Sequence, residues 1–109
     1  MRYALLVYRD EAVEAGPEGE MRAALDALTR ELGSRLIESI RLRPVPTATK
    51  VQVREGGLVI ADGPFAETKE QIGGFLVVES EDLDEAIEVA ARLPMARLGT
   101  IEVRPIWEM

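Results

Sequence analysis

The first strand that the sequence predicts, residues 2–9, is apolar on both of its faces. Successive side chains of a strand point to opposite faces. One face carries Tyr3, Leu5 and Val7, and the other carries Ala4, Leu6 and Tyr8. Residues 75–79 show the same two-sided pattern. Because strands of this kind are typical of a sheet covered on both sides, the chain needs a fold that covers both faces of its sheet.

Two helices are predicted between the strands. From residue 18 to about residue 40, apolar residues recur at steps of three and four, which predicts one helical stripe. The stripe consists of Met21, Leu25, Leu28, Leu32, Leu36 and Ile40. Pro17 fits the first helical position, and Gly33-Ser34 is expected to end or kink the helix. Asp82 is a suitable N-cap for a second helix. That helix would end at Pro94 and place on one side Leu83, Ala86, Ile87, Ala90 and Leu93.

The remaining segments predict further strands. Residues 49–54 alternate in polarity, and an apolar run, residues 58–61, resumes after a glycine pair, which indicates a hairpin with one rather polar face. The last strand spans residues 100–107, and Pro105 favours an edge position or the end of the strand. The predicted fold class is therefore α+β, a ferredoxin-like βαββαβ antiparallel sheet with both helices on one face. We expect residues 1–109 to form a single domain.

Two helices on one face leave the other face of the sheet uncovered. A chain of 109 residues has no further element to cover it. The simplest solution is a second copy of the chain, packed sheet against sheet. We therefore expect a homodimer that buries at least about 1,000 Å² in its interface.

Composition excludes several classes of protein. The chain has no Cys and no His, which excludes disulfide scaffolds, zinc–thiolate sites and Ser-His-Asp or Cys-His catalysis. No apolar run approaches the roughly 18 residues of a membrane span, and no signal peptide opens the chain, so we expect a cytoplasmic protein with no membrane partner. A net charge of −7 argues against nucleic acid as a partner.

The most unusual segment is residues 62–75, and two interpretations of it stay open. In the structural one, Asp62 closes a turn, Phe65 fills part of the core, and Gly73-Gly74 allows a close approach of the backbone. Glu67, Lys69 and Glu70 are then solvated loop charges.

In the functional interpretation, these side chains form a site between strands. A carboxylate at the mouth of an apolar pocket has a raised pKa and can act as an acid or base, a role for which Asp62 is the candidate. Arg43, Arg54 or Arg104 would hold an anionic substrate, with Lys69 or Tyr8 as a hydrogen-bond donor. The candidate ligand-binding residues are Tyr8, Arg43, Asp62, Phe65, Glu67, Lys69, Glu70 and Arg104. We expect no cofactor and no metal, since the spacing of Asp62, Glu67 and Glu70 matches no standard cation loop.

Several segments together resemble a known family. They are residues 3–8 with Asp10-Glu11, Pro46-Thr47-Ala48-Thr49, residues 62–75, residues 82–86 and residues 101–105. The chain resembles the YCII-related superfamily over nearly its whole length, and in particular the branch named for the motif Asp-Gly-Pro-Phe, present here as residues 62–65. The resemblance implies a ferredoxin-like fold, a dimeric α+β barrel and kinship with muconolactone isomerase-type proteins.

For function the resemblance implies less. Other YCII-like proteins have a His-Asp pair proposed as an acid–base dyad, which does not carry over to a chain without histidine. Members of the branch are often encoded beside extracytoplasmic-function sigma factors, which implies a regulatory link. Residues 37–43 depart from the Gly-rich stretch of many relatives, so a pocket wall formed there would differ.

Two functions remain. The first is a homodimeric small-molecule-binding or regulatory protein, whose ligand would be anionic if the arginines hold it. The alternative is a small-molecule isomerase, lyase or hydrolase that uses Asp62 as acid or base without a histidine. The lack of histidine, the side chain best suited to proton transfer near neutral pH, favours the first.

Overall fold

The computed structural model describes residues 1–13, 16 and 18–108. Along the chain, its helices and strands are β1 (Arg2–Arg9), α1 (Glu18–Leu32), β2 (Leu36–Arg41), β3 (Thr49–Arg54), β4 (Gly57–Asp62), β5 (Gln71–Glu79), α2 (Leu83–Arg92) and β6 (Thr100–Pro105). Pro17, the predicted first residue of the first helix, lies outside the described residues. No helix in this part of the chain is long and apolar enough to cross a membrane.

The described strands form a four-stranded sheet in the order β2-β5-β1-β6 and a separate two-stranded sheet, β3-β4. The neighbours in the larger sheet are all antiparallel. With α1 after β1 and α2 after β5, this is the ferredoxin-like arrangement, into which the β3–β4 hairpin is inserted. The predicted α+β class and the antiparallel sheet with two helices are confirmed.

Both helices pack on one face of the larger sheet. Leu5 of β1 is completely buried there, with Leu76 and Val78 of β5 beside it. Helix α1 contributes Leu28 and Leu32 to this core. From α2 come Ala86, Val89 and Ala90, and Leu93 follows directly after the helix. The helix-covered face therefore holds the core of the protomer.

The opposite face of the sheet, here called the open face, carries apolar side chains without a covering layer. In β1 these are Ala4 and Leu6, which lie opposite Val77 and Phe75 of β5. All four are half-buried, whereas their neighbours Leu5 and Val7 on the helix side are buried. The two-sided pattern of the sequence thus corresponds to one face under helices and one face that is open.

The prediction for residues 36–40 is wrong. The helical stripe was expected to continue through Leu36 and Ile40, but α1 ends at Leu32 and these residues belong to strand β2. Gly33 has a φ of +56°, the left-handed conformation that ends helices and that glycine adopts at low cost. A short 3-10 turn follows, and the extended chain then pairs with β5, with Ile40 opposite Phe75.

Helix α2 begins as predicted, but its buried side is shifted. The Asp82 carboxylate accepts a hydrogen bond from the backbone N–H of Glu85 at 2.9 Å, which confirms the N-cap. Leu83 and Ile87 were expected to face the core, yet both are exposed, and Val89 is buried instead. Residues 86, 89, 90 and 93 follow the i, i+3, i+4, i+7 spacing of one helical face, which Leu83 and Ile87 flank on one side. The last strand is at the sheet edge and ends at Pro105, as the proline indicated.

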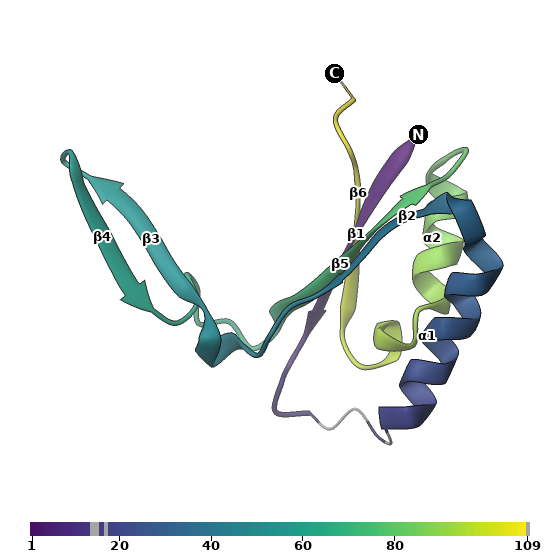
Figure 1. Cartoon of the computed structure of the whole chain (residues 1–109), viewed down its shortest axis with the longest axis horizontal. Coiled ribbons are helices and arrows are strands. Elements are labelled where there is room, and N and C mark those ends of the chain that lie inside the picture. Colours follow the sequence, from purple (N-terminus) through teal and green to yellow (C-terminus); the bar gives the residue numbers. More distant parts are fainter. Residues whose placement is uncertain (14–15, 17, 109) are drawn as a thin grey trace.

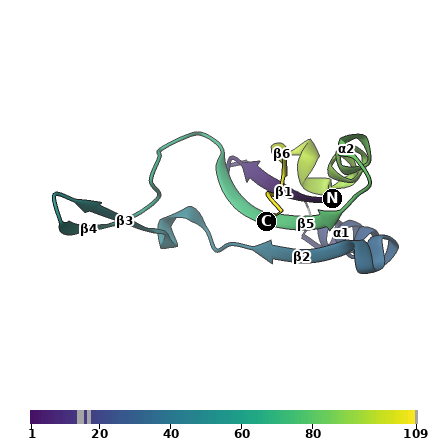
Figure 2. The same cartoon turned by 90° about the horizontal axis from the view of Figure 1, so that it is seen from above.

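The β3–β4 hairpin, here called the arm (residues 49–62), extends away from the rest of the protomer. Figure 1 shows the larger sheet between the helices on one side and the arm on the other. In the view from above, the arm again lies beyond the end of the sheet (Figure 2). The arm explains the flat, elongated protomer, whose dimensions are 47 × 40 × 19 Å.

Candidate functional site

The segment between the arm and β5 borders a cavity of about 470 Å³. Three connections meet at this cavity: the turn after β1, the short turn between β2 and β3, and the segment between β4 and β5. The lining residues are Asp10, Glu11, Ala12, Val45, Pro46, Pro64, Glu67, Thr68, Lys69 and Gln71. Five of these residues lie within 62–75, the segment in which the sequence placed a site.

Hydrogen bonds hold the connections in place. Both carboxylate oxygens of Glu11 accept from the backbone N–H of Val45, at 3.1 and 3.2 Å, which ties the turn after β1 to the β2–β3 connection. The side-chain amide of Gln71 donates to the carbonyl oxygens of Ala66 and Thr68, at 2.5 and 3.1 Å. Thr68 in turn donates its hydroxyl proton to the carbonyl oxygen of Glu70 at 2.7 Å. The walls of the cavity are therefore fixed by bonds that do not involve Glu67 or Lys69.

Glu67 and Lys69 are the charged groups available to a ligand. Within the described residues, neither side chain takes part in an ion pair or a side-chain hydrogen bond. Lys69 is also the basic residue among those that line the cavity, and the lining includes three acidic residues, Asp10, Glu11 and Glu67. The cavity thus offers one strong donor and several carboxylate acceptors.

Tyr8 and Glu70 lie in a different place, at the end of the open face. The Tyr8 hydroxyl donates to a carboxylate oxygen of Glu102 at 3.4 Å. Thr100, which lies opposite Tyr8 in the sheet, donates its hydroxyl to Glu70 at 3.1 Å. Tyr8 and Glu70 thus bond to Glu102 and Thr100 on the edge strand β6, and neither of them lines the cavity.

The other predicted site residues are exposed and lie apart. Asp62 ends β4 opposite Thr49, and Arg43 lies in the connection after β2. Arg104 is on the edge strand β6, opposite Ala4 on the open face. Phe65 is 80% exposed, so the interpretation that it fills the core is wrong. The reason is its position beyond the end of the arm strand, where within this protomer no helix or sheet face packs on it.

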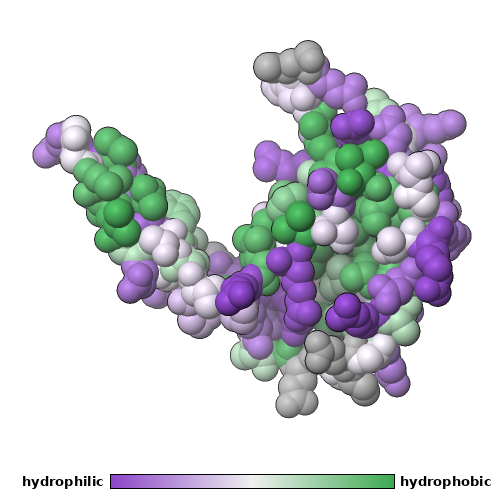
Figure 3. Space-filling model, in the orientation of Figure 1, coloured by the Kyte–Doolittle hydropathy of each residue, from purple (hydrophilic) through white to green (hydrophobic). Residues whose placement is uncertain are grey.

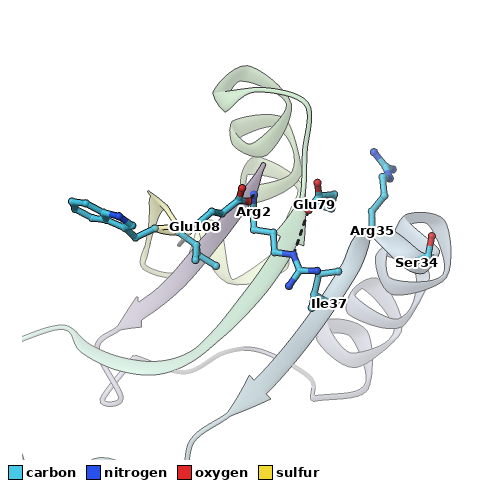
Figure 4. A pocket seen from close by; sticks show the side chains of 8 residues that line it. Arg2, Ser34, Arg35, Ile37, Glu79 and Glu108 are labelled. Carbon is cyan, nitrogen blue, oxygen red and sulfur yellow. Dashed lines mark hydrogen bonds and ion pairs between the residues drawn. The ribbon is translucent and has the colours of Figure 1, made fainter.

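A larger cavity, of about 670 Å³, lies near the start of β1 (Figure 4). Arg2 and Glu79 face each other there, with 3.5 Å between the Arg2 Nε and a Glu79 oxygen. The second arginine at this cavity, Arg35, is paired with Glu85 at 3.0 Å. Both cations therefore already have a carboxylate partner, and none of the residues predicted for the site lines this cavity.

Sequence reasoning missed part of the smaller cavity. Asp10, Glu11 and Gln71 contribute to its walls, but the sequence marked the first two only as part of a family resemblance. An acidic pair directly after a buried strand was the available signal. Among the described residues, no group of three or more Asp, Glu, His or Cys side chains is arranged to hold a metal ion.

Comparisons with known proteins agree with this architecture. The sequence profile described as "YCII-related domain" matches residues 1–109. An uncharacterized protein of Rhizobium meliloti (strain 1021), R00369, is 37% identical over 114 residues, which cover 97% of this chain and 92% of the relative. A similar solved structure is 5-chloro-2-hydroxyhydroquinone dehydrochlorinase (TftG) of Burkholderia phenoliruptrix AC1100 in complex with 2,5-dihydroxybenzoquinone. Its TM-score is 0.59 at 17% identity, over 99% of this chain and 94% of that one, a likeness that shows the fold.

Proposed function

The chain belongs to the YCII-related domain family, and we propose that it is a homodimeric protein that binds a small molecule in the cavity beside residues 62–75. One observation carries the proposal. Glu67 and Lys69 both line a cavity of about 470 Å³ whose walls are hydrogen-bonded without them. Charged side chains left without a protein partner at a formed cavity are suited to fixing the orientation of a ligand.

The lining residues restrict the chemistry of the ligand. Lys69 would bind one anionic oxygen, and the carboxylate of Glu67 would accept from a hydroxyl group. A ligand with several negative charges is disfavoured, because the lining contains three acidic residues, Asp10, Glu11 and Glu67, and one lysine. A small hydroxylated molecule with one ionised oxygen meets both conditions. In the form in which one of its two acidic hydroxyl groups is ionised, 2,5-dihydroxybenzoquinone, the compound bound to the structural neighbour, has this chemistry.

The family branch, the homodimer and the sigma-factor link are proposed from the resemblance to the YCII-related family and from the open face of the sheet. Residues 62–65 support membership of the Asp-Gly-Pro-Phe branch. The half-buried apolar side chains of the open face support a sheet-to-sheet homodimer, and hence an α+β barrel. A link to an extracytoplasmic-function sigma factor rests on the branch alone. With a net charge of −7, such a link would operate through protein contact or through the ligand, without nucleic acid.

Lys69→Met tests the cavity directly. Titrating the protein with 2,5-dihydroxybenzoquinone in a calorimeter should give saturable binding for the wild type. Losing a charge-assisted hydrogen bond of about 1.5–3 kcal/mol should weaken binding by roughly tenfold to a hundredfold. Lys50→Met is the matched control, because Lys50 lies on the arm and does not line the cavity.

If both lysine variants bind like the wild type, the ligand does not occupy this cavity. Equal losses in Lys69→Met and Lys50→Met would mean that the titration reports general charge attraction. Either result removes the proposed site.

The enzyme alternative predicts a different pattern. An isomerase, lyase or hydrolase that uses Asp62 should lose turnover in Asp62→Asn while it keeps its fold and its affinity. Because Asp62 is exposed and does not line the cavity, we expect Asp62→Asn to bind the probe within about threefold of the wild type. Calorimetry measures the affinity, and product analysis by chromatography measures turnover. Turnover by the wild type that disappears in Asp62→Asn would establish the enzyme alternative.

A further inference from the structure

One face of the arm is apolar and largely exposed to solvent. In the hairpin register, Val51 lies opposite Ile60 and Val53 lies opposite Leu58, so these four side chains share one face. Their exposed fractions lie between 59% and 65%. Figure 3 shows a hydrophobic patch on the arm and a V-shaped gap between the arm and the body of the protomer.

An arm of this composition needs a covering surface. A two-stranded hairpin is marginally stable at best in water, and its stability here gains little from burial of the four aliphatic side chains, which remain mostly exposed. Contiguous exposed apolar side chains of this kind mark interaction surfaces. The arm does not cover the open face of its own sheet, since its side chains remain exposed.

The distribution of charge along the chain indicates which surface covers the apolar face of the arm. Residues 41–62 carry four basic and two acidic side chains, whereas the rest of the chain carries nine basic and eighteen acidic ones. The excess of basic residues lies at the base of the arm, residues 41–48, which carry Arg41 and Arg43 and no acidic side chain, whereas the arm itself is neutral and the body is strongly negative. A second copy of this chain offers an acidic body to this positive base, and oppositely charged surfaces favour association.

We propose that the arm of each protomer packs its apolar face, Val51, Val53, Leu58 and Ile60, against the body of a second copy, beside the open face of the partner's sheet. The contact is made twice in the dimer, once by each arm, as two-fold symmetry requires. This inference rests on the proposed homodimer and adds a second contact to it. It also couples the dimer to the ligand site, because β4 of the arm leads directly to Pro64, which lines the cavity.

Two neighbouring residues provide a matched test. Ile60 is on the apolar face, whereas Val59 points to the opposite face, where it lies opposite Gln52. Analytical ultracentrifugation should show that Ile60→Asp raises the dimer dissociation constant at least tenfold, and that Val59→Asp changes it less than threefold. Equal effects of the two substitutions, or no effect of Ile60→Asp on a wild-type dimer, would overturn the arm contact and leave the sheet contact standing.

The chain has no cysteine, so single-cysteine variants give a second measurement that does not depend on weakening the dimer. The thiol of Val53→Cys should react with a maleimide at least tenfold more slowly at dimer concentrations than at monomer concentrations. The thiol of Val59→Cys should react at the same rate at both. If the two thiols are protected to the same extent, the arm contact is wrong. If the wild type is a monomer at all concentrations tested, the proposed homodimer fails together with it.

Discussion

Replacing Leu6 by aspartate is expected to convert the protein from a dimer to a monomer. Leu6 lies near the middle of the open face, between Phe75 on β5 and Glu102 on β6. In a sheet-to-sheet dimer the aspartate would be buried without a partner, which costs several kcal/mol. A loss of about 3 kcal/mol raises the dissociation constant roughly a hundredfold. Light scattering at micromolar concentration should then report a dimer for the wild type and a monomer for Leu6→Asp.

Ile87→Asp is the control for this experiment. Ile87 is an exposed aliphatic side chain on α2, on the helix side of the sheet. The same substitution there should leave the dimer intact, while far-UV circular dichroism shows that both variants keep their secondary structure. A wild-type monomer with a cooperative fold, or a dimer that persists in Leu6→Asp, would contradict a sheet-to-sheet interface.

The alternation of side chains explains why most of the sheet was predictable. The two-sided apolar patterns of residues 2–9 and 75–79 belong to β1 and β5, the two central strands of the four-stranded sheet. Pro105 favoured an edge position or a strand end, because proline cannot donate a hydrogen bond to a neighbouring strand, and β6 is at the edge and ends at Pro105. Asp82 marked a helix start through a side-chain contact that is local in sequence. In each case, the sequence signal that predicts the element lies within a few neighbouring residues.

The predictions from sequence were wrong or incomplete where contacts between distant segments determine the secondary structure or the position of an element. Leu36 and Ile40 continue a four-residue spacing from α1, so the sequence favoured a longer helix. Their pairing with β5, a segment more than thirty residues away, makes them a strand instead. Likewise, the hairpin at residues 49–62 was identified as a hairpin, but nothing local indicates that it leaves the main sheet.

The same distinction applies to the site. Glu67 and Lys69 were marked by the concentration of charges in residues 62–75, and both line the smaller cavity. Arg43, Asp62 and Arg104 were chosen for their chemistry, which contains no information about distance, and none of them lines this cavity. The contribution of Glu11 depends on its hydrogen bonds to Val45, a contact between two connections that only the folded chain brings together.

Leu5→Ala should cause the largest loss of stability among single truncations in β1. Leu5 is completely buried between the sheet and the helices, so the substitution removes apolar contacts and leaves a cavity. The expected loss in the free energy of unfolding is about 3 kcal/mol, within the range of 2–5 kcal/mol typical of such sites. Urea unfolding with an unchanged m-value measures it. Because this core lies within one protomer, the loss should be the same at low and high protein concentration.

Leu6→Ala, one residue further along the same strand, tests the contribution of the open face to stability, as Leu5→Ala tests that of the helix-covered face. In an isolated protomer Leu6 is only half-buried, so its truncation should cost less than that of Leu5. In a dimer it would lose additional contacts with the partner, and association stabilises the folded state more as concentration rises. The stability difference between the wild type and Leu6→Ala should therefore grow with protein concentration, unlike the difference for Leu5→Ala. A difference independent of concentration would mean that the open face stays in contact with water, and that its apolar residues serve a purpose other than assembly.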